Sequence, residues 1–147
     1  MIFDRTELFS SAQAITGTAA STNVLDTGAT GTVYGAAAAL RRDLGKGIPL
    51  PLAIRVVQSF NNLTSLTITY EVADDAAFST NKTTVFTSPA YTLAQMASGA
   101  AYILPDTVPV EANRRYHRLL YTVAGTAPTL GQITAGIVDG QQTNSIL

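Results

Sequence analysis

The sequence predicts an all-β fold, a jelly-roll-like antiparallel β-sandwich, on three observations. Short segments rich in β-branched and aromatic residues recur with turn signals roughly every 8–12 residues, as in sandwiches and jelly rolls. The clearest segment, SLTITYEV at 65–72, alternates apolar and polar side chains without a break, as a half-buried strand does. The alternation of strands with long helical patterns that marks parallel α/β folds is missing.

Composition limits the classes to which the protein can belong. Its 147 residues suit a single β-sandwich domain over 1–147. Charged residues make up 13%, about half of the ~25% usual in soluble domains, so we expect partners to cover part of the surface. A net charge of −1 offers no basic field, which argues against nucleic-acid binding. No apolar run approaches the ~20 residues of a membrane span, so we expect no membrane association.

The first segment, residues 1–11, is predicted to form an irregular, extended arm. It mixes polar residues with the apolar side chains of Ile2, Phe3 and Phe9, which can anchor a segment on another surface. The alternative is a terminal strand that packs on the chain's own domain. The sequence by itself leaves both interpretations open.

A long loop is predicted over residues 27–50, after two short strands at 12–16 and 22–26. Five glycines punctuate it, and the stretch AAAALRRDL at 36–44 favours helix but is too short to be stable alone. Loops of this length are uncommon in compact domains and are usually functional or disordered. We therefore expect one long loop with at most one helical turn.

From residue 51 onward the β-pattern is regular. Pro49 and Pro51 place the first strand of this part at a sheet edge, because proline cannot donate to a β-ladder. A helical turn is expected within 91–99, and residues 140–147 are expected to form a flexible tail. The strands are predicted, in order, at 51–60, 65–72, 83–88, 101–105, 115–123 and 132–138.

Two adjacent carboxylates, Asp74 and Asp75, follow the strand at 65–72 and raise the question of a catalytic pair. Such a pair needs a cleft and a further polar group such as His or Lys. An aspartate at a strand end instead accepts hydrogen bonds from backbone N–H groups and starts a turn. We interpret the pair as a structural turn in which Asp75 caps residues 76–78 and Phe78 folds back under the sheet.

His117 is the single histidine of the chain. Without cysteine or converging carboxylates it cannot build a zinc site. It shares one face of its strand with Leu119, Tyr121 and Val123, so we expect it to be buried. The alternative is a pH-sensitive role at an interface.

The sequence carries no set of residues that would make an enzyme. It has no G-x-S-x-G elbow, and Gly45-Lys46-Gly47 lacks the spacing of a phosphate loop. We therefore expect no catalytic activity, no cofactor and no metal site. Two basic pairs, Arg114 with Arg115 and Arg41 with Arg42, are candidates to bind carboxylates of a partner, and the alternative is a solvated strand edge.

Several segments, in their order along the chain, resemble one family. They are AQAITGTAASTNVLDTG, PLAIRVVQSF, LTITYEVADDAAFST, RYHRLLYTVAGT and ITAGIVDGQQ. The most specific pieces are DDAAFS at 74–79 and the RxxRLxYTV pattern at 115–123. In these the chain resembles the capsid cement (decoration) proteins of the Bordetella phage type, found in tailed phages and prophages. The resemblance covers most of the chain and departs from the family at an apparent insertion, residues 31–42.

The resemblance implies a structural virion protein, made in the bacterial host cytoplasm and placed on the outer capsid surface. It implies a homo-oligomer, a dimer, that bridges major capsid proteins of the HK97-type fold and has neither enzymatic activity nor a cofactor. The candidate capsid or oligomer contacts are Ile2, Phe3, Phe9, Arg41, Arg42, Arg114 and Arg115.

A second class of function is a carbohydrate- or receptor-binding β-sandwich module of a phage fibre. Carbohydrate sites usually present exposed aromatic side chains, and tryptophan is absent from this chain. Tyr34, Tyr91 and Tyr102 are the candidate platform for such a site.

Overall fold

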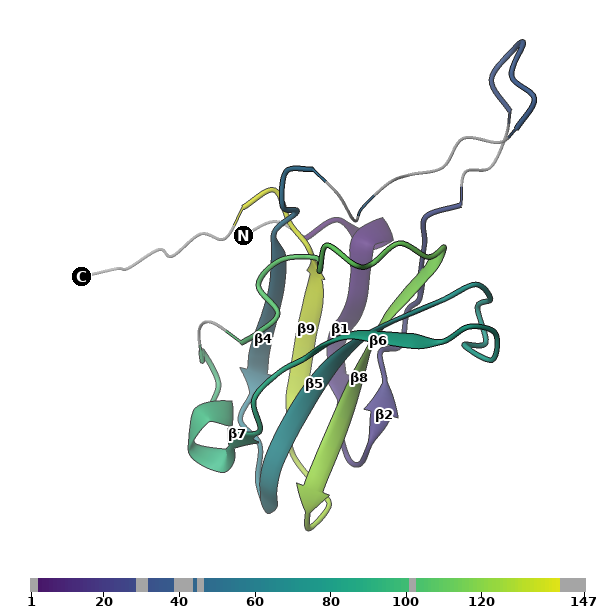
Figure 1. The fold of residues 1–147 in the computed structure, drawn as a ribbon. Helices are drawn as coiled ribbons and strands as arrows, with labels where there is room; N and C mark the ends of the chain where they lie inside the picture. Colours follow the sequence, from purple (N-terminus) through teal and green to yellow (C-terminus); the bar gives the residue numbers. More distant parts are fainter. Residues whose placement is uncertain (1–2, 29–31, 39–43, 45–46, 101–102, 141–147) are drawn as a thin grey trace.

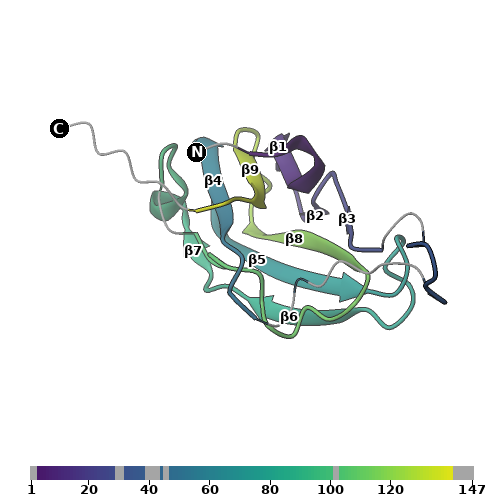
Figure 2. The same ribbon diagram turned by 90° about the horizontal axis from the view of Figure 1, so that it is seen from above.

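The computed structural model describes residues 3–28, 32–38, 44, 47–100 and 103–140. Two antiparallel sheets pack face to face, which confirms the predicted all-β sandwich (Figures 1 and 2). The strands are β1 (Leu8–Ala14), β2 (Ala19–Ala20), β3 (Leu25–Asp26), β4 (Leu52–Gln58), β5 (Leu63–Ala73), β6 (Thr83–Thr87), β7 (Tyr91–Thr92), β8 (Tyr116–Gly125) and β9 (Gln132–Ile137). Two 3₁₀ turns, η1 (Arg5–Glu7) and η2 (Leu93–Met96), complete the elements.

The two sheets differ in size. The smaller has the order β1-β9-β4, so β4 lies at an edge, as its flanking prolines predict. The larger has the order β2-β8-β5-β6, with β3 also pairing with β8 and β7 with β5. Figure 2 shows β4, β9 and β1 in one layer and β8, β5 and β6 in the other.

The alternation along β5 places its apolar face in the core. Leu66, Ile68, Tyr70 and Val72 are each at most 1% exposed. Burial of each large apolar side chain contributes roughly 1.5–3 kcal/mol to stability. The long ladder between β5 and β8, which pairs Tyr70 with Leu119, forms the backbone of the larger sheet.

The N-terminal segment is a strand rather than an arm from residue 8 onward. Strand β1 pairs with β9, near the other end of the chain, and Leu8 lies opposite Gly136. The side chain of Phe9 is fully buried in the core, against the ring of Tyr70. The prediction that Phe9 contacts a partner is therefore wrong, because no part of its side chain reaches the surface.

The prediction of a strand at 101–105 is also wrong for residues 103–105, the part that the structure describes. Residues 103–105 form no strand, and the amide of Leu104 donates to the hydroxyl of Tyr91 at 2.8 Å instead of to a ladder. Pro105 has no N–H to offer. The helical turn expected within 91–99 is η2, whose four residues, 93–96, are fewer than the nine of that range.

The described part of the long loop contains one tight turn. The amide of Ala36 donates to the carbonyl of Val33 at 2.9 Å, and Gly35 has a φ of 82°. Residues 36–38 are not helical, and the rest of the stretch AAAALRRDL, apart from Leu44, lies outside the described residues, as does nearly all of the predicted tail. None of the helices in the described part is long and apolar enough to cross a membrane.

Candidate functional site

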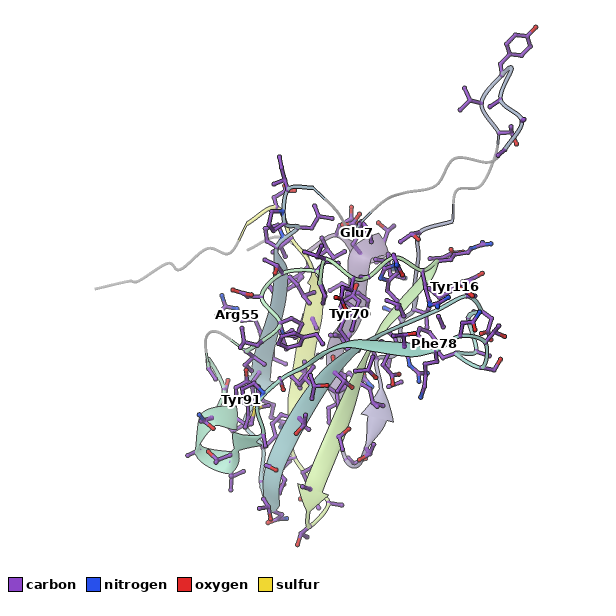
Figure 3. The ribbon with its side chains drawn as sticks, in the orientation of Figure 1. Glu7, Arg55, Tyr70, Phe78, Tyr91 and Tyr116 are labelled. Carbon is purple, nitrogen blue, oxygen red and sulfur yellow. The ribbon has the colours of Figure 1, made fainter. Side chains whose placement is uncertain are left out.

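The two segments that resemble the family most specifically, 74–79 and 115–123, lie together at one end of the larger sheet. Residues from β3, β5, the turn after β5, the segment that leads into β8, and β8 itself bring eight charged side chains together there. We define this charged cluster as Asp26, Glu71, Asp74, Asp75, Lys82, Arg114, Arg115 and Arg118. Figure 3 labels Phe78 and Tyr116 at this end of the sheet.

Asp75 organises the turn after β5. Its carboxylate accepts hydrogen bonds from the amides of Ser79 and Thr80, the latter at 2.6 Å, and from the Ser79 hydroxyl at 2.7 Å. The turn at this position agrees with the sequence prediction, but the capped amides lie further along the chain than 76–78. These bonds, first that from the Ser79 side chain, lower the pKa of Asp75 to about 2.

The turn also buries an aromatic ring, but on the outward face of the sheet, beside Arg118, and not in the core beneath the sheet as predicted. Phe78 is only 6% exposed, although its φ of 56° is rare for a bulky residue. The guanidinium of Arg118 lies 4.1 Å from the centre of the Phe78 ring, a favourable cation–π distance. The positive φ is therefore held by the ring's burial and by this contact.

Asp74 ties the turn to the start of β8. Its carboxylate accepts from the side-chain Nδ2 of Asn81 at 2.7 Å and from Arg114 Nη1 at 2.8 Å. These two bonds lower the pKa of Asp74, the Asn81 bond being the larger cause. Because both aspartates have lowered pKa values, they stay ionised at neutral pH and neither can act as a general acid there.

Asp26 and Arg115 form the second tie, at the start of the long loop. Arg115 Nε and Nη2 donate to the two carboxylate oxygens at 2.7 and 2.9 Å, and the pair raises the pKa of Arg115. The Asp26 carboxylate also accepts from the Gly28 amide at 2.8 Å. A Cβ on Gly28 would lie 2.3 Å from Arg115 Nε, so a larger residue there would displace the guanidinium from this position.

Sequence reasoning missed four residues of the cluster, of which Glu71 is the most buried; the four are Asp26, Glu71, Lys82 and Arg118. Glu71 points away from the core, as alternation predicts, yet it is only 3% exposed. Arg118 donates to it at 2.7 Å, and Lys82 Nζ lies 3.5 Å away. The signal in the sequence was an acidic residue on a strand face otherwise made of serine and threonine.

The charged cluster is balanced within itself. Its four carboxylates face four cations, and the ion pairs join Arg114, Arg115, Arg118 and Lys82 to carboxylates of the same chain. The role of Arg114 and Arg115 in binding a partner's carboxylates stays a prediction, and such a partner would compete with these pairs. In the described part of the chain, no three His, Cys, Asp or Glu side chains are placed to hold a metal ion.

His117 lies on the core side of the same sheet end, as its strand position predicts. It is 1% exposed, and its Nδ1 lies 3.1 Å from the Tyr70 hydroxyl. Burial lowers the pKa of His117 to about 4, an effect that the backbone of Arg114 partly offsets. Nε2 makes no well-formed hydrogen bond to the described residues. The imidazole is therefore neutral at physiological pH.

The remaining predicted contacts do not gather at this end. Phe3 is half-buried, and its ring lies 3.2 Å from where a Cβ on Gly136 would be, over the smaller sheet. Ile2, Arg41 and Arg42 lie outside the described residues.

The tyrosines proposed as a carbohydrate platform are not assembled in the described part of the chain. Tyr91 lies on β7, and Figures 1 and 2 show β7 and the turn that carries Tyr34 at opposite ends of the molecule. The Tyr91 hydroxyl is already bonded to the Leu104 amide. Tyr102 lies outside the described residues.

Comparison with protein families places the chain in one of them. No curated protein matches the chain. The model of the Bbp16 family matches residues 9–137, which include every strand of the sandwich except the first residue of β1. Since the match spans most of the chain, this phage protein belongs to the Bbp16 family, a family of Bordetella phage proteins.

Proposed function

We propose that the protein is a capsid cement subunit, which binds the outer surface of a tailed-phage capsid and bridges major capsid proteins of the HK97-type fold. In this proposal it acts as a homo-oligomer, a dimer, and performs no catalysis. Membership of a phage protein family supports a role in the virion.

The observation that carries the proposal is the contrast between the sandwich and its long loop. The sandwich is closed by a continuous core and by a charged cluster that is paired within itself. The turn at 32–38 stands well clear of the sandwich (Figure 1), and Tyr34 at its tip is completely exposed. A rigid body with a projecting segment suits a subunit that spans neighbouring subunits of a lattice.

The physical benefit of such a subunit is mass action. A protein that binds the assembled lattice and not its free subunits stabilises the lattice in proportion to its own binding free energy. Repetition over many symmetric positions turns weak individual contacts into strong overall retention.

The test is co-sedimentation with empty shells of the major capsid protein of the same phage, in unexpanded and expanded form. We expect saturable pelleting at a fixed ratio, and a higher melting temperature of the shells when the protein is bound. The ratio would identify which symmetry positions are filled.

If the protein stayed in the supernatant with both kinds of shell, the cement function would be refuted. A glycan array would then test the receptor-binding alternative. Bovine serum albumin at the same concentration is the control for trapping in the pellet.

A further inference from the structure

We propose that Tyr34 is an anchor, which the long loop inserts into an apolar pocket of a capsid shell subunit. The inference rests on the proposed cement function and goes further, because it names the contacting residue and the chemistry of the pocket.

The turn presents the Tyr34 side chain to the outside. Val33 and Ala36 close the turn by their backbone hydrogen bond of 2.9 Å. Gly35 has a φ of 82° and Tyr34 is not among the residues of positive φ, which defines a type II turn with Tyr34 at its second position. Glycine at the third position of this turn costs no strain. Tyr34 is therefore held at the tip by a defined backbone geometry.

Tyr34 differs from the other aromatic residues of the described chain. It is 104% exposed, whereas the other described aromatic residues are buried or half-buried, for example Tyr70 and Tyr121 in the core and Tyr91 on β7. An aromatic ring carries roughly 150–250 Å² of surface that is better removed from water. Tyrosine is also enriched among the residues that dominate protein–protein binding.

The neighbours of Tyr34 define what the partner site must look like. The described turn, residues 32–38, reads TVYGAAA and contains no charged residue. Val33 beside the tyrosine is 50% exposed, and the alanines that follow are small. One ring flanked by small uncharged residues fits a narrow apolar pocket with at most a hydrogen-bond acceptor or donor for the hydroxyl.

The charged cluster fixes the base from which the loop departs. Thr27 donates through both its amide and its hydroxyl to the carbonyl of Arg115, each at 2.9 Å. The next residue, Gly28, is bonded to Asp26, which is paired with Arg115. A fixed base reduces the conformational freedom that the loop loses on binding.

The experiment measures shell binding of Tyr34→Ala, Tyr34→Phe and the unchanged protein at low and high salt. We expect the alanine variant to bind at least about tenfold more weakly, as truncated anchor residues do. The phenylalanine variant should bind within a few-fold of the unchanged protein, because it keeps the ring. The loss should be the same at both salt concentrations, because no charge is removed.

A matched control is Leu130→Ala, which removes an apolar side chain that is 51% exposed, in the connection between β8 and β9. It should bind as the unchanged protein does. Because Tyr34 has no contact in the sandwich to lose, Tyr34→Ala should keep the melting temperature, which excludes misfolding as the cause.

Three results would count against the inference. If the unchanged protein binds shells and Tyr34→Ala binds within about twofold, the anchor is refuted while the cement function stands. If the unchanged protein does not bind, the cement function itself fails. With p-benzoyl-phenylalanine in place of Tyr34, we expect a photo-cross-link to the major capsid protein, and a cross-link to a second copy of this chain would refute the choice of partner.

Discussion

Asp26 and Arg115 lie 89 residues apart in the sequence and form a two-bond ion pair, with donor–acceptor distances of 2.7 and 2.9 Å. The pair joins β3, where the long loop begins, to the start of β8 in the larger sheet. Both side chains are partly exposed, so the pair itself adds little stability. The pair instead fixes the direction in which the chain leaves β3 at Gly28.

Gly28→Ala tests this arrangement. The added Cβ would displace the Arg115 guanidinium, the flexible end of a long side chain, so the fold should survive with a slightly lower melting temperature. The ion pair should open, and therefore Arg115→Ala should have a smaller effect in the Gly28→Ala background than alone. Thermal unfolding of the two single variants and the double variant measures this coupling.

Gly17→Ala is the matched control for that cycle, because a Cβ there meets nothing within 4 Å. The loss of stability from Gly17→Ala and the loss from Arg115→Ala should add in the double variant. Additivity in the Gly28 cycle as well would show that the close approach at Gly28 does not control the pair.

The turn after β5 should depend on the ionised carboxylate of Asp75. Its pKa is lowered from 3.8 to about 2, so the unfolded chain takes up the proton more readily. The stabilisation is present above pH 3.8 and is lost as the pH falls towards 2. Asp75→Asn should lower the melting temperature at pH 6, and the difference from the unchanged protein should shrink by pH 2.

An unchanged melting temperature of Asp75→Asn at pH 6, together with a loss of shell binding, would show instead that Asp75 contacts a partner. Asp4→Asn is a useful control, because Asp4 is also an exposed cap with a lowered pKa but precedes η1, away from the turn after β5.

Glu71 should be the cluster residue with the largest effect on stability. It is nearly buried, and Glu71→Ala would leave the guanidinium of Arg118 without its counter-ion. Breaking a buried pair in this way costs about 3–5 kcal/mol of unfolding free energy. Lys82→Ala should cost less than about 1 kcal/mol, because a partly exposed pair is screened by solvent. Urea unfolding of both variants measures the difference, and equal costs would contradict the ranking.

His117 should make the fold sensitive to mild acid. Its pKa is 6.5 in the unfolded chain and about 4 in the folded protein, so between these values the unfolded state binds more protons. Stability should therefore fall as the pH drops from 6.5 to 4 and lose roughly 3 kcal/mol in all. Urea unfolding across this range measures the slope.

His117→Gln removes the titrating group and should flatten the curve between pH 6.5 and about 5.5, above the range in which carboxylates titrate. The Tyr70 hydroxyl is the titratable group that contacts His117, and burial raises its pKa, so it keeps its proton throughout. A slope that persisted in His117→Gln would assign the acid sensitivity to another group.

The sequence by itself determined the features that depend on local pattern. Alternation along 65–72 placed Leu66, Ile68, Tyr70 and Val72 on the core face, and strand parity placed His117 with Leu119 and Tyr121. The Asp75 turn was readable because a short acidic side chain bonds to amides only a few residues away. Such features need no knowledge of distant parts of the chain.

Only the tertiary structure decided what lies against these local elements. Phe9 is buried because β1 pairs with β9, and a strand of mixed pattern does not reveal so distant a partner. Alternation shows that Glu71 points away from the core, but not that Arg118, Lys82 and neighbouring segments cover it. Asp26 meets Arg115 for the same physical reason: a pairing across 89 residues is fixed by strand order in the sheet, and strand order is a property of the whole fold.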